Sequence, residues 1–456
     1  MSDVLCVDVG STFTKAVLAD ADSGELLATA SHPTTRPDVL AGIAAVQEAT
    51  QAQTGRPVDD VLVCSSAGGG LRLAVVGYER LVTAEAGHRV ALSAGGRVVH
   101  LSSGPLDPAG IAELRASRPD LIVLTGGTDG GNADVVVHNA RAIAIARLAP
   151  VVLAANAEAT HAAAAELLGR GRRVTVTANV LPQIGVLDPF PARRAIREAF
   201  LAHVIGGKGL SRDSARLAGR TFAQLVRAPT PDAVLDGVGL LAPEEDVVLV
   251  DVGGATTDVY SVRSPERDTG AGQPARPVVE ALWRARTVEG DLGVRVGARG
   301  LIEAATAEGL LAGEALDRLT RYADQLSRPG HCRAELDVEL AALATLIAVR
   351  RHGRPDRPGS APRPLREIHR VIGSGGVLRH AADAARAAIL EPLLADHGGG
   401  WTVPDRAGLA VDARATLFAA GLLAATAPVA ATRLARAGLS AVAVSTGRSG
   451  SSTAGW

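Results

Sequence analysis

The chain of 456 residues contains few cysteines and very little lysine. Cys6, Cys64 and Cys332 lie far apart, so the sequence offers no disulfide framework, no zinc site and no complete ligand set for an iron–sulfur cluster. Scattered free thiols suit a reducing cytoplasm, which is the localisation that we expect. Lysine occurs only at positions 15 and 208. Lys208 fits a solvated loop, whereas Lys15 is conspicuous because a compact ammonium charge suits a phosphate.

Strong net charge and long apolar runs are also absent. The formal net charge is −1, which excludes the electrostatic footprint of a protein that binds nucleic acid or an acidic membrane. No apolar run reaches the roughly 18 residues that span a bilayer, and the first residues show no secretory signal pattern. The composition, with 47% hydrophobic and 21% charged residues, predicts a globular protein of two or three domains.

One pattern occurs twice: an apolar strand, Asp-x-Gly, a turn of small and hydroxyl residues, and a second strand. In the first copy, residues 4–18, the key positions are Asp8, Gly10, Ser11, Thr12 and Lys15. In the second copy, residues 247–262, they are Asp251, Gly253, Gly254, Thr256, Thr257 and Asp258. Each copy alone also fits an ordinary β-hairpin with a glycine turn, but the recurrence favours two halves of one nucleotide site.

The residue types in both copies suit phosphate binding. Glycine lets the backbone approach an anion closely, and turn N–H groups with Ser and Thr hydroxyls can surround it. A carboxylate beside a phosphate implies a cation between them. We therefore expect Asp8 and Asp251 to hold Mg²⁺ through its waters, and Lys15 to offset phosphate charge.

From residue 71 onward, short apolar strands alternate with helical segments, which predicts an open parallel sheet. Its glycine-rich turn at 126–132 is compatible with binding an anion or partner group, or with helix capping by Asn132 or Asp134.

Five regions of the chain are expected: the first part of half one, an inserted doubly wound α/β module, a helical return and connection, half two, and a disordered tail. Their predicted ranges are 1–70, 71–185, 186–245, 246–440 and 441–456.

Several charged residues can be explained by ordinary structural roles instead of a role in binding or catalysis. In the helical return, Arg193, Arg194, Arg197 and Glu198 fit a solvated helix face. Glu158 is a candidate for orienting water, although its position after a strand is more typical of a carboxylate at the start of a helix.

A third element follows: an apolar lead-in, the turn Gly373-Ser374-Gly375-Gly376, and a helical segment at 378–394. The three elements in this order resemble the actin-like ATPase superfamily, which includes sugar kinases, Hsp70 chaperones and actin. The resemblance implies an α/β, actin-like ATPase fold of two ribonuclease-H-like halves, with an open parallel α/β module inserted in the first half. It also makes residues 8–15 and 251–258 the two phosphate motifs and 373–376 the adenosine motif.

The wider sequence is similar to the MutL-type accessory proteins encoded with adenosylcobalamin-dependent glutamate (methylaspartate) mutase. This resemblance implies ATP or ADP and Mg²⁺ as cofactors, mutase subunits as partners, and a chaperone that assembles or reactivates the mutase. A small-molecule kinase of the sugar or acyl type and a nucleotide-dependent structural or filament protein remain alternatives. The inserted module is similar in architecture to cobalamin-binding modules, which implies a surface that mimics or docks beside the mutase's cofactor domain.

The mechanism that we expect places Mg-ATP in a cleft between the two halves. Asp8 and Asp251 would orient the waters of Mg²⁺, and Asp258 would position Mg²⁺ or polarise the attacking water, which makes these three the predicted catalytic residues. The turns at 10–12 and 253–257 would hold the phosphates, and the turn at 373–376 the adenosine.

Overall fold

The computed structural model describes residues 2–66, 71–79, 82–94, 97–184, 186–204, 210–211, 215–264, 284–326, 332–355 and 362–443. The described residues fall into two compact units. The first lies within Met1–Glu244, Tyr260–Thr287 and Ala415–Gly438, and the second within Glu245–Val259, Val288–Arg414 and Leu439–Trp456. The range predicted for half two, 246–440, is therefore divided between the units.

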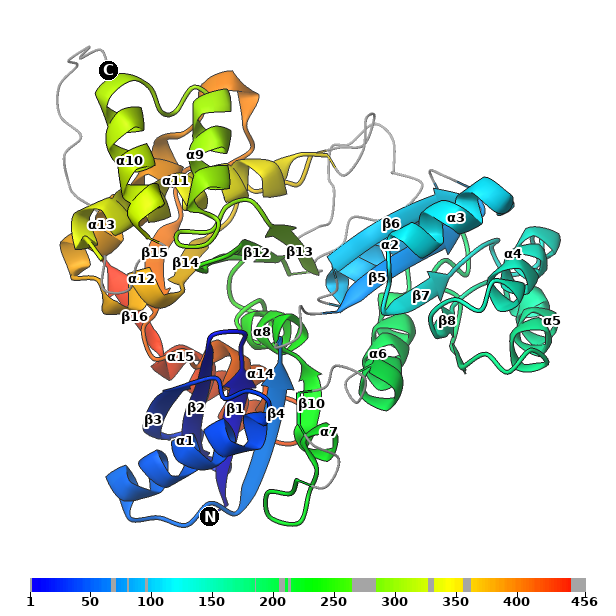
Figure 1. Cartoon of the computed structure of the whole chain (residues 1–456), viewed down its shortest axis with the longest axis horizontal. Coiled ribbons are helices and arrows are strands. Elements are labelled where there is room, and N and C mark those ends of the chain that lie inside the picture. The colour runs from blue at the N-terminus through cyan, green and yellow to red at the C-terminus, as the bar shows by residue number, and fades with distance from the viewer. Residues whose placement is uncertain are drawn as a thin grey trace. The chain divides into compact units, whose positions relative to one another are not determined.

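The first sheet has the strand order β10-β4-β1-β2-β3 (Figure 1). Its strands are β1 Asp3–Val9, β2 Phe13–Asp20, β3 Leu26–Pro33, β4 Asp60–Ser65 and β10 Val226–Pro229. β1, β2 and β3 pair antiparallel, while β4 is parallel to both β1 and β10. Every residue of β1 is buried, which fits an apolar central strand. Helix α1, Val39–Thr54, begins where the Asp38 side chain accepts from the Leu40 amide and ends at left-handed Gly55.

The inserted region forms a second, wholly parallel sheet with the order β6-β5-β7-β8-β9. The strands are β5 Arg72–Gly77, β6 Arg97–Ser103, β7 Leu121–Leu124, β8 Val151–Leu153 and β9 Val174–Val176. The helices between them are α2 Thr83–Ser93, α3 Pro108–Ala116, α4 Asp134–Ile145 and α5 Ala157–Leu168 (Figure 1). The predicted open parallel module is confirmed.

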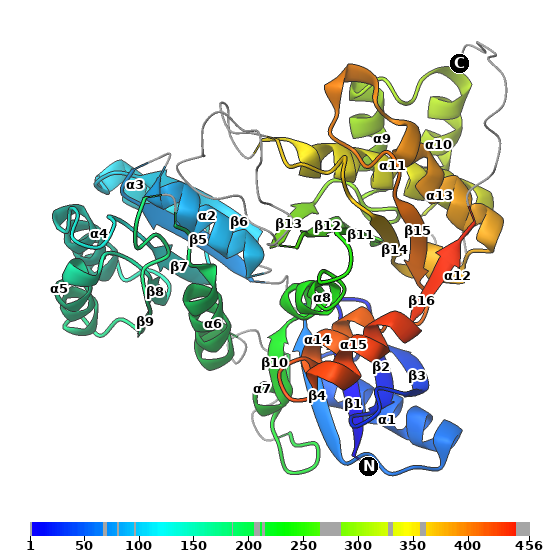
Figure 2. The ribbon, with the colours of Figure 1, turned by 180° about the vertical axis from the view of Figure 1, so that it is seen from behind.

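The region after the inserted module contains α6 Pro189–Ala199, the π-helix η1 Phe200–Val204, α7 Phe222–Leu225 and α8 Thr230–Gly239. Strand β10 separates α7 from α8 because Val226 and Ala228 are buried as the chain pairs with β4. Helix α8 packs closely on α14, Leu417–Leu423, and α15, Pro428–Ala437, follows α14 (Figure 2).

The third sheet has six strands in the order β13-β12-β11-β14-β15-β16. They are β11 Val247–Val252, β12 Thr257–Val262, β13 Arg284–Glu289, β14 Arg370–Ser374, β15 Gly408–Asp412 and β16 Leu439–Val442. Numbered by their order in the chain, the first five strands repeat the order of the first sheet, 3-2-1-4-5. This duplication confirms the predicted α/β fold of two ribonuclease-H-like halves. Ala441 and Val442 belong to β16, so the predicted tail starts too early; residues 444–456 lie outside the described chain.

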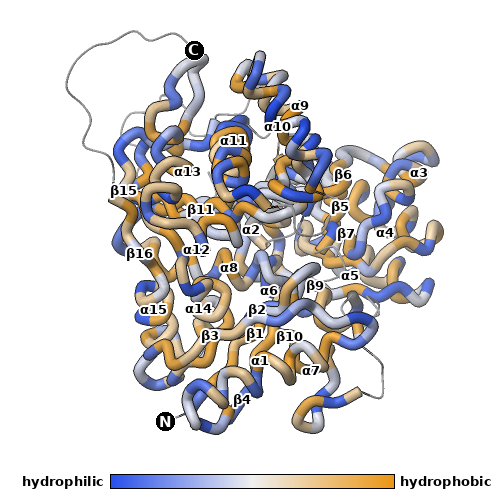
Figure 3. Tube along the Cα trace, turned by 60° about the vertical axis from the view of Figure 1, so that its left-hand side comes forward, coloured by the Kyte–Doolittle hydropathy of each residue, from blue (hydrophilic) through white to orange (hydrophobic). Residues whose placement is uncertain are grey.

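The remaining helices are α9 Ala298–Ala307, α10 Gly313–Gln325, α11 Ala334–Gly353, α12 Gly376–His380, α13 Asp383–Ala395 and the 3₁₀ turn Gly398–Gly400. Helix α10 is mostly hydrophilic with intervening apolar residues (Figure 3). The segment predicted as one helix, 378–394, divides into α12 and α13 because Ala381 and Ala382 adopt extended backbone conformations. Among the described helices, none has the length and apolar character needed to cross a membrane.

Candidate nucleotide site

The turn between β1 and β2 is closed by one backbone hydrogen bond. The Gly10 amide donates to the Phe13 carbonyl at 3.0 Å, and a Cβ at Gly10 would lie 2.8 Å from that oxygen. Thr34, which sequence reasoning missed, braces the turn: its hydroxyl donates to the Gly10 carbonyl at 2.8 Å and its amide to Thr12 O at 2.9 Å. Ser11 and Thr12 are exposed residues of this turn.

Asp8 lies at the end of β1 with a side chain that is 9% exposed. Its carboxylate accepts a hydrogen bond from Thr230 Oγ1 at 2.6 Å, lies 3.8 Å from Cys64 Sγ, and lies 4.0 Å from Lys15 Nζ. Burial, together with the nearby Asp8 charge, raises the pKa of Cys64 well above its usual value, so this thiol stays protonated and donates to the carboxylate. Lys15 pairs with Asp8 across β1 and β2.

The turn between β11 and β12 repeats the first turn. The Gly253 amide donates to the Thr256 carbonyl at 2.9 Å, and a Cβ at Gly253 would lie 2.7 Å from that oxygen. The neighbouring segment supports this turn, because Val294 N donates to Gly253 O at 3.1 Å and Arg295 N to Gly254 O at 2.8 Å. No motif in the sequence marked this supporting segment.

The hydroxyl residues of the second turn differ in their surroundings. Thr256 is half-buried, as are Asp251 and Asp258. Thr257 is fully buried, and its hydroxyl donates to the Leu292 carbonyl at 2.5 Å. The Thr257 side chain therefore braces the turn from inside.

The predicted adenosine turn lies beside the second phosphate turn. β14 runs parallel to β11, so that Asp251 pairs with Ser374 and Val250 with Gly373. Gly375 has φ +106°, and a Cβ there would lie 2.1 Å from the Val252 carbonyl oxygen. Only glycine fits this position, because the backbone is left-handed and packs directly against β11. The carboxyl ends of β11 and β14 thus bring Asp251, the glycine turn after it and residues 373–376 together.

The described residues contain no group of three or more His, Cys, Asp or Glu side chains that could hold a metal ion. Of the predicted metal-binding carboxylates, Asp8 lies in the first unit, and Asp251 lies with Asp258 in the second. Carboxylates are ligands that Mg²⁺ takes together with waters and substrate phosphates.

Two other predicted candidates have structural roles. In the glycine-rich turn after β7, the Gly130 amide donates to Glu158 Oε2 at 2.8 Å, and the Ala157 amide donates to Asp129 Oδ1 at 3.0 Å. The Gly130 amide of the turn is thus satisfied by Glu158, and the Asp129 carboxylate of the turn binds the first residue of α5. Glu158 lies in the first turn of α5, as the alternative interpretation predicted, and Asn132 Oδ1 accepts from the Val135 amide at 3.3 Å.

The interpretation of the α6 charges as one solvated face is wrong for two of them. Arg194 and Glu198 are exposed, but the guanidinium groups of Arg193 and Arg197 bind carboxylates of α8. The helical spacing of charges looks the same for a solvated face and for a face that meets opposite charges, so the sequence does not separate the two cases.

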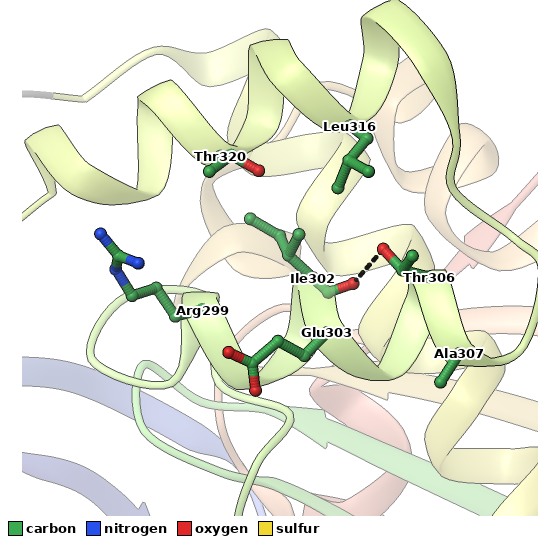
Figure 4. Close-up of a pocket in the computed structure, with 7 residues that line it drawn as sticks. All are labelled: Arg299, Ile302, Glu303, Thr306, Ala307, Leu316 and Thr320. Atoms are coloured by element: carbon green, nitrogen blue, oxygen red, sulfur yellow. Dashed lines mark hydrogen bonds between the residues drawn. The ribbon is translucent and has the colours of Figure 1, made fainter.

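A separate groove of about 440 Å³ lies between α9 and α10. Ile302 and Leu316 contribute apolar side chains, and Arg299 and Glu303 contribute charged ones (Figure 4). The groove contains none of the predicted nucleotide-binding residues.

The sequence profile of the family described as MutL protein matches residues 4–439. The chain belongs to this family. Protein MutL of Clostridium tetanomorphum is 33% identical over 471 aligned residues, which cover 95% of this chain and 98% of that protein. Together with the duplicated turn, this match confirms the resemblance found in the sequence.

Similarity to solved structures is weaker. A nucleotide-free acetone carboxylase is 16% identical with a TM-score of 0.39, covering 92% of this chain and 70% of that chain. The ROK hexokinase of Thermus thermophilus is 15% identical with a TM-score of 0.30, covering 95% of this chain and 97% of that chain. These similarities give no information about the function of this MutL family member.

Proposed function

We propose that this MutL family member binds Mg-ATP through the two duplicated turns and the 373–376 loop. The observation that carries the proposal is the repeated geometry of the turns, in which Gly10 N to Phe13 O and Gly253 N to Thr256 O are equivalent hydrogen bonds of 3.0 and 2.9 Å. Two such turns, each beside an aspartate at the end of a buried strand, suit the phosphates of a nucleotide.

The roles of the residues follow from their surroundings. Amides and hydroxyls at 10–12, 253–254 and 256 bind phosphate oxygens, and Lys15 offsets their charge. Asp8 and Asp251 would hold Mg²⁺ through its waters, and Asp258 would position Mg²⁺ or polarise the attacking water. The backbone at 373–376 would hold the adenosine, and free space adjoins it at Gly376. When bound, Mg²⁺ offsets the negative charge of the phosphates during phosphoryl transfer.

The test of the nucleotide site is Asp251→Asn, measured as steady-state ATP turnover and as affinity for a fluorescent ATP analogue. We expect turnover to fall by about a hundredfold because preorganised charge at the phosphates is lost. Asp383→Asn is the matched control, because the Asp383 side chain is 83% exposed on α13. Unchanged turnover in Asp251→Asn would refute the proposed site.

We further propose that ATP turnover drives an accessory chaperone function toward an adenosylcobalamin-dependent mutase of the glutamate mutase type. The support is membership of the MutL family. The protein should hydrolyse ATP slowly without any small substrate, turn over faster when the inactivated mutase is added, and restore mutase activity only when ATP is present. A requirement for a small phosphate acceptor instead would indicate a kinase.

A further inference from the structure

Helix α8 begins beside the first nucleotide motif. Thr230 is its first residue, and the Thr230 hydroxyl donates to Asp8 Oδ1 at 2.6 Å. The two residues are 222 positions apart in the chain. The start of α8 therefore fixes the orientation of the Asp8 carboxylate.

Two residues further along, α8 enters a buried cluster of charges. Asp232 and Asp236 lie four residues apart and so share one face of the helix. Arg193 donates to Asp232 at 3.2 Å and to Asp236 at 2.8 Å, and Arg197 Nε donates to Asp232 at 2.6 Å. A third arginine, Arg284 of β13, donates to Asp236 at 2.9 Å.

The cluster is largely removed from solvent. The Asp232 and Arg193 side chains are 4% and 12% exposed, and that of Arg197 is 31% exposed. Burial raises the pKa of Asp232, whereas the three arginines hold the pKa of Asp236 below its usual value despite its burial. Buried ion pairs of this kind are costly to separate because an unpaired charge would remain in a poorly solvated site.

The opposite face of α6 packs on the inserted parallel module. Ala192, Ala195 and Ile196 are buried in the same apolar core as Val123 of β7 and Val152 of β8. Helix α6 also contacts α2, β7, β8 and β9 of the module. Helix α6 therefore packs one face on the module, while its Arg193 and Arg197 side chains bind the carboxylates of α8.

We propose that α6 and α8, joined by Arg193, Arg197, Asp232 and Asp236, link the inserted module to Asp8. The inference rests on the proposed function for the statement that Asp8 faces Mg-nucleotide. Through this link, a partner that binds the module changes the affinity for nucleotide, and nucleotide changes the affinity for the partner by the same factor. Thr230 is then a positioning residue for Asp8, and the ion-pair cluster connects α6 with α8.

The first test needs no nucleotide. Amide hydrogen exchange is compared between the wild type, Arg197→Met and Arg194→Met, which removes an exposed arginine of the same helix. We expect Arg197→Met to speed exchange in α8 and in the turn at 10–14, and Arg194→Met to leave both unchanged. Unchanged exchange at 10–14 in Arg197→Met would overturn the link, as would an increase spread evenly over all the sheets, which reports lowered global stability.

The second test is a double-mutant cycle on the affinity for fluorescent Mg-ADP. Thr230→Val and Arg197→Met should each weaken binding about fivefold, and the double variant should bind no worse than the weaker single variant. Thr230→Ser should bind like the wild type because it retains the hydroxyl. Multiplying effects in the double variant would overturn the link. If the wild type binds no nucleotide, the proposed function fails, and the exchange measurement still decides the link.

Discussion

At the scale of single residues, glycines occupy positions where two backbone segments are in direct contact. Gly375 and Gly376 are neighbours with opposite requirements. A Cβ at Gly375 would lie 2.1 Å from the Val252 carbonyl oxygen, whereas a Cβ at Gly376 meets nothing within 4 Å. Substitutions at these two positions therefore distinguish the effect of tight backbone packing from the effect of changing the glycine motif.

We expect Gly375→Ala to lower the free energy of unfolding by about 2 kcal/mol or more and to abolish nucleotide binding, since β11 and the loop after β14 must move apart. Gly376→Ala should leave stability within about 0.5 kcal/mol of the wild type, because it lies at a helix start with free space. Urea denaturation and nucleotide titration check both variants. Equal losses in the two variants would contradict this explanation.

A buried histidine gives the protein a predictable pH dependence. His352 is completely buried, and burial, reinforced by the positive charge of Arg363, holds its pKa well below the usual value. The folded state keeps the imidazole neutral, while the unfolded state binds a proton below about pH 6.5. The stability from His352 is therefore complete above that pH and declines as the pH falls below it.

We expect the free energy of unfolding to fall by up to about 1.4 kcal/mol per pH unit below about pH 6.5 from this residue alone. His352→Asn should flatten that part of the profile, although it also lowers stability at neutral pH. Replacement of the exposed His380 by Asn is the matched control for the loss of one imidazole. Identical slopes in wild type and His352→Asn, from urea denaturation across the pH range, would show that His352 does not contribute.

At the scale of helices, α8 and α14 cross at a contact made by glycines. A Cβ at Gly237 would lie 1.9 Å from the Leu417 carbonyl oxygen, and a Cβ at Gly421 would lie 1.8 Å from the Ala233 carbonyl oxygen. The two backbones touch directly, so neither helix can accept a side chain at the crossing without moving.

Gly421→Ala should destabilise the protein by about 3 kcal/mol, because the added methyl group clashes with rigid backbone rather than with a flexible side chain. The gain in helix propensity, about 1 kcal/mol, offsets only part of this loss. Gly398→Ala, with open space around it, is the control. Thermal unfolding of the two variants measures the difference, and a stabilised Gly421→Ala would rule out the close crossing.

Local sequence patterns predicted many strands correctly. They did not predict contacts between residues that lie far apart in the chain. Alternation of apolar strands and helices identified β5 to β9, because that pattern is local. The break between α12 and α13 was missed because Ala381 and Ala382 are good helix formers whose extended conformation is imposed by the surrounding structure. The role of Arg193 and Arg197 depends on Asp232, which lies more than 30 positions away and has no local signal.

The same limit applies to the site. Asp8, Asp251 and the glycine turns could be found because each motif lies within a short stretch of chain. Thr230 and Thr34 could not, because they reach Asp8 and Gly10 only through tertiary folding. The binding roles of the motif residues remain predictions.

At the scale of the whole molecule, metal should matter for nucleotide binding and not for folding. The described residues offer no cluster of side chains that could hold a metal without a nucleotide. Chelation of divalent cations should therefore weaken ATP binding by about tenfold or more and leave the unfolding temperature of the nucleotide-free protein unchanged. Calorimetry with and without chelator tests both statements. A drop in unfolding temperature without nucleotide would point to a structural metal instead.

The first unit is assembled from segments that are far apart in the chain, and its last part comes from Ala415–Gly438. Helix α14 packs on β1, β4 and α8, and the Cys6 thiol lies 3.7 Å from the Ala419 carbonyl oxygen. During synthesis, at about 5–20 residues per second, the earliest strands must therefore wait for almost the entire chain before this surface is covered. A ribosome that stops before α14 would release a protein whose first sheet keeps α1 but lacks the cover of α14, and such exposed apolar surface is what cellular quality control recognises.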